Sequence, residues 1–174
     1  ILLGENWPVH RKRFIFQVGF SLVLILIVTV QTFWPFLPVK GKVDVTNRYH
    51  IYNAFPVELK AYLPAHPEFQ NKRLLANNYQ IPSMINFYLN PVLEASALSI
   101  NYHETLYSFL YQDGMFVGND FLFLKRGKTF TKKFTPYFDD AILLQLFESK
   151  RLGQKVAGYS LWSVTNYRGK YTAN

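Results

Sequence analysis

The residues best suited to metal binding or acid–base chemistry are the histidines, of which the chain has four. No two of them have the i, i+3 or i, i+4 spacing that places ligands on one face of a helix. A metal site would need histidines from distant segments to meet beside an acid. We therefore expect isolated surface or hydrogen-bonded histidines and no bound metal, with a spatial cluster as the alternative. The residues concerned are His10, His50, His66 and His103, with Glu58 or Glu104 as the acid.

Asp139 and Asp140 are the one pair of adjacent carboxylates that suggests shared acid–base chemistry. Successive residues of a helix point about 100° apart, so a helical pair is poorly placed to share a proton. We expect them instead to stabilise the start of a helix. Ser160, in the sequence GYSLW, lacks the second glycine of a nucleophile elbow. We expect no catalytic residues, no cofactor and no enzymatic activity.

The chain contains no cysteine, which excludes disulfide scaffolds, zinc–thiolate sites, cysteine-ligated iron–sulfur clusters and c-type haem. Of its 174 residues, 49% are hydrophobic and 18% aromatic, so the chain is not wholly disordered. Several aromatic runs, above all Asn77–Asn90 and the C-terminal tail, are rich in Tyr and Asn. We expect these runs to contact partners, since Tyr combines apolar area with a polar tip.

The formal net charge of +8 is concentrated in the last third of the chain, because residues 121–174 carry ten bases and three acids. This basic patch predicts binding to anionic phospholipid or to an acidic partner subunit. A solvated basic face remains the simpler alternative. RNA ranks lower, because no RNA-binding motif accompanies the charge. The expected patch consists of Lys125, Arg126, Lys128, Lys132, Lys133, Arg168 and Lys170.

The clearest feature is an uncharged stretch, Phe14–Val39, with the almost purely aliphatic centre LVLILIVTV. About 20 apolar residues are enough for a helix to cross the hydrocarbon core. We therefore predict a transmembrane helix over 14–36. A long core helix and a signal peptide fit less well, since the stretch is uncharged and no small-residue cleavage site follows it. The expected membrane-interface anchors are Arg11, Lys12, Arg13, Phe33 and Trp34.

Basic residues are almost equally dense on the two sides of this stretch, so the positive-inside rule gives little indication of the membrane topology. A slight preference puts the N-terminus on the cytoplasmic or matrix side. The chain begins with Ile1 and not with Met, so we expect either that a leader such as a transit peptide has been removed or that the sequence is a processed or truncated form.

The chain should divide into an N-terminal flank over 1–13, the helix over 14–36 and a small mixed α+β domain over 40–174. In that domain we expect strands over 43–52 and 57–63, a short surface helix over 68–78, and a helix that begins at Pro91. We also expect hairpins that turn at Asp113–Gly114 and Arg126–Gly127. A helix from Pro136 to Arg151, capped by Thr135 and closed by Gly153, should precede one or two strands in the tail.

These expectations together predict a non-catalytic, single-pass accessory subunit of a large membrane complex. A basic, cysteine-free chain with a missing leader favours a respiratory-chain or ATP synthase complex of the mitochondrial inner membrane. A bacterial inner membrane or another organellar membrane is the alternative. Other subunits and anionic phospholipid are the expected partners, and nucleic acid is not expected. The competing functions are a membrane-tethered assembly or translocation factor and an anchor for an RNA-containing particle.

Overall fold

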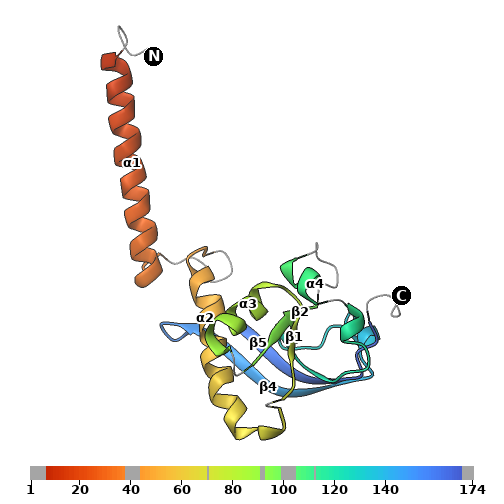
Figure 1. The fold of residues 1–174 in the computed structure, drawn as a ribbon. Coiled ribbons are helices and arrows are strands. Elements are labelled where there is room, and N and C mark those ends of the chain that lie inside the picture. The colour runs from red at the N-terminus through yellow and green to blue at the C-terminus, as the bar shows by residue number, and fades with distance from the viewer. Residues whose placement is uncertain are drawn as a thin grey trace. The chain divides into compact units, whose positions relative to one another are not determined.

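The computed structural model describes residues 7–37, 44–69, 71–90, 93–98, 105–111 and 113–169. The chain forms two compact units, Ile1–Asn47 and Arg48–Asn174. Figure 1 shows the elements of both units in chain order. Pro91, His103 and Lys170, which figure in the sequence predictions, lie outside the described residues.

The first unit contains helix α1, Trp7–Phe33. Every side chain from His10 to Val30 is exposed, and His10–Phe33 is long and apolar enough to cross a membrane. The helix ends just before Pro35, since Trp34 makes its last backbone bond, from its N–H to the carbonyl of Val30 at 2.7 Å. A helix was predicted over 14–36, but α1 begins earlier and carries the predicted basic anchors within its first turns.

The second unit is built on a five-stranded mixed sheet with strand order β2-β1-β3-β5-β4. The short strands β1 (Leu74–Ala76) and β2 (Ala95–Ala97) are parallel, and β1 is also parallel to β3 (Phe121–Arg126). Strands β4 (Asp140–Arg151) and β5 (Gln154–Thr165) form an antiparallel hairpin that joins the sheet through β3. The mixed α+β class is therefore confirmed.

One face of the sheet is covered by α2 (Asn47–Tyr62) and α3 (Gln80–Leu89). The buried residues Ile51, Phe55, Leu59 and Leu63 recur every fourth position and form one stripe against the sheet. Pro56 lies inside α2 and has no N–H to donate to the preceding turn. Near this interruption, the Ile51 carbonyl accepts hydrogen bonds from Ser149 Oγ at 3.1 Å and Tyr159 Oη at 2.5 Å.

The opposite face is covered by irregular segments whose aromatic side chains form a second core. Phe123 of β3 is fully buried there, with its ring centroid 5.2 Å from that of Phe134 and 5.8 Å from that of Phe130. Tyr167, from the C-terminal tail, is also fully buried in this cluster. Much of the aromatic content thus packs the domain itself, and Tyr167 of the tail, where partner contact was expected, belongs to this core.

The structure corrects the predictions for the first half of the domain. The strands expected over 43–52 and 57–63 are replaced by α2 and the 3₁₀ turn Leu63–Ala65. The surface helix expected over 68–78 is replaced by the 3₁₀ turn Pro67–Phe69 and the buried strand β1. Residues 95–97 of the helix expected after Pro91 form the edge strand β2. In each case, tertiary burial outweighs the local pattern.

The second half of the domain contains two further corrections. Helix α4 (Leu106–Leu110) and the 3₁₀ turn Asp113–Met115 replace the hairpin expected around Asp113–Gly114. Strand β3 forms as predicted, but it pairs with β5 and not with residues 128–134. The tail strand prediction is confirmed by β5.

The helix expected from Pro136 to Arg151 is also wrong. Thr135–Tyr137 is a 3₁₀ turn and β4 follows it. A register shift between Leu143 and Gln145 interrupts the alternation of β4. The apolar residues Ile142, Leu143, Leu146 and Phe147 have a helix-like spacing in the sequence, but only Phe147 is buried. Leu152 and Gly153 both have positive φ, at 45° and 79°, and form the two-residue turn to β5.

Candidate interaction surfaces

The end of α1 is tied to the segment that follows it by a group of hydrogen bonds, which we call the elbow. Gln31 is only 4% exposed, although the rest of the apolar helix is open. Its Nε2 donates to Asp44 Oδ2 at 3.0 Å, and its Oε1 accepts from the Leu37 N–H at 2.9 Å. Asp44 Oδ1 accepts from the backbone N–H and the hydroxyl of Thr46, at 2.9 and 2.5 Å. The chain therefore folds back on the helix end where it leaves the apolar stretch.

All five predicted interface anchors are exposed on the first unit. Arg11, Lys12 and Arg13 lie in the first turns of α1, and Phe33 and Trp34, 79% and 72% exposed, lie at its other end. This arrangement places cationic and aromatic side chains at opposite ends of the apolar surface. Aromatic rings of this kind favour the headgroup region of a bilayer.

The predicted basic patch lies mainly in the segment between β3 and the 3₁₀ turn Thr135–Tyr137. Phe130 and Phe134 fasten this segment to the sheet, since their rings pack against Phe123. Lys133 Nζ lies 5.0 Å from the centroid of the Phe134 ring. Four exposed cations make up what we call the basic loop: Arg126 at the end of β3, and Lys128, Lys132 and Lys133 in the segment that follows it.

Two other predicted members of the patch, Lys125 and Arg168, bind groups of the domain itself. Lys125 is 5% exposed, and its Nζ donates to the Thr129 carbonyl at 2.6 Å. Burial, together with the nearby Lys133 charge, lowers the pKa of Lys125. Arg168 binds Asp139 Oδ1 through Nε at 2.7 Å and Nη2 at 2.5 Å. Lys125 is therefore withdrawn from the surface, whereas Arg168, whose side chain is 52% exposed, is paired with Asp139 at the surface.

Asp139 and Asp140 do not start a helix. Asp139 accepts from Asn166 Nδ2 at 2.5 Å as well as from Arg168, and these bonds lower the pKa of its carboxyl group. Asp140 begins β4, where its carboxylate accepts from the Ala141 N–H at 2.8 Å. The two carboxylates thus have separate roles in holding the tail and starting the strand.

The residues weighed for metal or nucleophile chemistry are dispersed. In the described part of the chain, no group of three or more His, Asp or Glu side chains is placed to hold a metal ion. His66 Nδ1 lies 3.2 Å from Glu68 Oε1, in a local pair. Ser160 is fully buried within β5 and has no hydrogen-bond partner for its hydroxyl.

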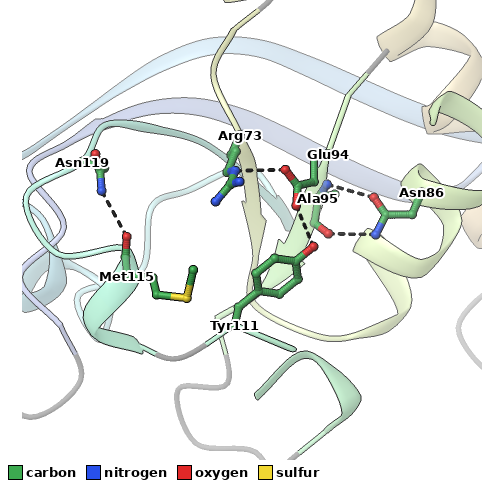
Figure 2. Close-up of polar contacts among 7 residues, drawn as sticks. All are labelled: Arg73, Asn86, Glu94, Ala95, Tyr111, Met115 and Asn119. Carbon is green, nitrogen blue, oxygen red and sulfur yellow. Dashed lines mark hydrogen bonds and ion pairs between the residues drawn. The ribbon is translucent and has the colours of Figure 1, made fainter. Parts of the chain in front are cut away.

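A cluster that the sequence predictions missed surrounds the carboxylate of Glu94 (Figure 2). Arg73 Nε lies 2.9 Å from Glu94 Oε2, and the Tyr111 hydroxyl donates to Oε1 at 2.6 Å. This hydrogen bond, together with burial, raises the pKa of Tyr111. The three residues come from separate segments with no shared motif, so only the folded chain reveals the cluster.

Beside Arg73 lies a partly open cavity of about 230 Å³. This volume is below the range of about 300–1,000 Å³ that ligand pockets usually have. The cavity therefore suits a small polar group or a single partner side chain better than a large substrate. Its lining residues are Asn71, Arg73, Met115, Phe116, Asn119, Asp120 and Phe121.

Comparison with known proteins gives no further information about these surfaces. No protein-family model, no curated protein and no solved structure matches the chain.

Proposed function

We propose that this protein is a single-pass membrane protein whose helix α1 crosses a bilayer. The observation that carries the proposal is the continuous exposure of apolar side chains along α1, from Phe14 to Val30. Exposing an aliphatic side chain to water costs about 1.5–3 kcal/mol relative to burying it, so an uncovered helix of this composition is strongly unfavourable in water. A bilayer covers all sides of such a helix at once.

In this proposal the protein is a non-catalytic accessory subunit of a large membrane complex. Its second unit offers surfaces for contact, namely the basic loop and exposed apolar side chains on α3 and α4 such as Phe87 and Phe109, 79% and 75% exposed. Apolar side chains exposed to this extent favour contact with another apolar surface. The cations of the basic loop suit anionic phospholipid or an acidic neighbouring subunit.

We assign the complex to an energy-transducing membrane, and specifically propose a respiratory-chain or ATP synthase complex of the mitochondrial inner membrane. The basic composition without cysteine and the apolar helix support this assignment. Anionic lipids in such a membrane would attract the basic loop.

The test is gentle detergent extraction of native membranes, followed by size separation and mass spectrometry of the co-migrating proteins. A structural subunit should co-migrate with one large complex at a fixed stoichiometry. Migration as a free monomer or as a species of variable size would contradict this function and favour a membrane-tethered assembly factor.

A further inference from the structure

The β4–β5 hairpin extends beyond β3, and we call residues 148–158 the hairpin end (Figure 1). Strand β3 pairs with β5 only as far as Tyr159, whereas β4 and β5 stay paired up to their turn. One face of the hairpin end is fixed to α2, since Ser149 Oγ donates to the Ile51 carbonyl at 3.1 Å. Side chains that alternate with Ser149 along β4 therefore lie on the face away from α2.

That face carries an unfavourable arrangement of charges. Glu148 and Lys150 alternate with the buried Ser149, and Lys150 pairs directly with Lys155 of β5. Like charges directly opposite each other on two strands destabilise a sheet. Lys155 Nζ also binds the Glu148 carboxylate. This bond, together with the nearby charges of Lys150 and Lys128, lowers the pKa of Glu148. Three cations, one of them from the basic loop, thus gather around a single acid.

The turn of the hairpin exposes an apolar side chain on a strained backbone. Leu152 has a φ of 45° and is 68% exposed. This left-handed region suits glycine or asparagine and is unfavourable for a bulky side chain such as leucine. Neither burial nor backbone preference therefore favours leucine at this position. Strained residues of this kind cluster where a protein contacts a ligand.

We propose that the hairpin end docks on an anionic phospholipid surface. Leu152 enters the headgroup layer, and Lys128, Lys150 and Lys155 lie beside lipid phosphates. The inference concerns the second unit alone. It rests on the proposed function, which brings the chain to a membrane, and it names phospholipid as the partner of the basic loop.

An anionic lipid surface accounts for both unfavourable features of the hairpin end. Phosphates offset the repulsion between Lys150 and Lys155, and the lipid layer covers the exposed Leu152. A nucleic acid would leave the leucine in water, and residues 148–158 contain no aromatic side chain on which a base could stack. An acidic protein would satisfy the lysines but would also need a pocket for the leucine.

The test uses the full chain in vesicles, either of phosphatidylcholine alone or of phosphatidylcholine with phosphatidylglycerol. Because the chain lacks cysteine, one fluorophore can be attached at a time. Gln154→Cys places it at the exposed hairpin end without removing Leu152, and Ile25→Cys places it within α1. Lipids with a nitroxide on the headgroup quench the label at 154 on contact, and lipids with a nitroxide on the acyl chain quench the label at 25.

Two substitutions should weaken the lipid contact without weakening the fold. Leu152→Asn removes the apolar side chain and suits a positive φ better. Lys150→Gln removes one member of the like-charge pair. Both variants should therefore keep or raise the urea midpoint of unfolding. Lys60→Gln removes an exposed charge from α2 and is the matched control.

We expect quenching at 154 to be several-fold stronger with phosphatidylglycerol than without it. Leu152→Asn and Lys150→Gln should each reduce it several-fold, and Lys60→Gln should not change it. If the label at 25 is quenched, equal quenching at 154 in both lipid mixtures, or no effect of either substitution, would overturn the docking. If 154 stays unquenched and Lys150→Gln releases the chain from its complex, the docking is also overturned, in favour of an acidic subunit. An unquenched label at 25 would contradict the proposed function itself.

Discussion

Replacing Asn86 by alanine should destabilise the second unit, because this side chain closes the outer edge of β2. Its Oδ1 accepts from the Ala95 N–H and its Nδ2 donates to the Ala95 carbonyl, both at 2.8 Å (Figure 2). Ala95 is fully buried, so the substitution leaves two backbone groups without partners. Each such group costs about 1–3 kcal/mol. Asn86 itself is half-buried and water can partly replace it, so we expect a loss of about 2–4 kcal/mol.

The assay is urea unfolding of the full chain in detergent, followed by circular dichroism, together with hydrogen exchange of the segment that contains Ala95. Faster exchange there would show that β2 loosens. Asn86→Asp keeps the acceptor for the Ala95 N–H but places a carboxylate oxygen against the Ala95 carbonyl, so it should also destabilise the unit. Asn90→Ala changes an exposed asparagine just after α3 and is the matched control, with an expected change within about 0.5 kcal/mol. If Asn86→Ala behaves like Asn90→Ala in both measurements, the edge-closing role is refuted.

Three further substitutions test other contacts. Because hydrogen bonds lower the folded-state pKa of Asp139, its contribution to stability is present above the unfolded pKa of about 4 and is lost as the pH falls through the lower folded value. Asp139→Asn should therefore reduce stability at neutral pH and weaken the loss of stability as the pH falls below about 4, as measured by unfolding over a series of acidic pH values. Lys125→Met removes a buried charge at similar volume and should leave the thermal midpoint unchanged or raise it, whereas Lys125→Ala should lower it. Gln31→Leu keeps α1 apolar but removes the elbow bonds to Leu37 and Asp44, so limited proteolysis of the segment after α1 should be faster, and unchanged rates would contradict the elbow.

The apolar helix was predictable because a single run of consecutive apolar residues is enough to identify it. Few structures other than a membrane-spanning helix contain an uncharged run of this length. Helix α1 covers most of the predicted range. Its start was misplaced because Arg11, Lys12 and Arg13 were read as a flank, while basic residues continue a helix as readily as they precede one. Composition identifies such a helix better than it locates the ends.

The domain was harder to predict because its patterns are ambiguous at short range. Ile51, Phe55 and Leu59 form a helical stripe, but Val43, Val45, Tyr49 and Ile51 alternate like a strand in the same stretch. In β4 the opposite error arises, since Ile142, Leu143, Leu146 and Phe147 have helical spacing in the sequence but lie in a strand. The choice in both places is made by partners distant in the sequence.

Among the predicted contact residues, features that depend on neighbours in the sequence could be predicted, and contacts between distant residues could not. Clustering of charge in the sequence located the basic loop, which the structure presents to solvent. It did not reveal that Lys125 is buried or that Arg168 neutralises Asp139. The Arg73–Glu94–Tyr111 cluster carries no sequence signal, because its three members come together only after β1 and β2 have paired.

The strand order has a consequence for how the chain is made. Strand β1 lies in the sheet between β2 and β3, yet β3 is synthesised about 45 residues after it and the β4–β5 hairpin that flanks β3 comes last. Translation proceeds from the N-terminus, so α1 and α2 emerge while the surface that buries Phe55 and Leu59 does not yet exist. The hairpin, in contrast, can close rapidly on its own as soon as it emerges. The five-stranded sheet can therefore be completed only after the C-terminal hairpin has been synthesised, when α1 and α2 have long since emerged.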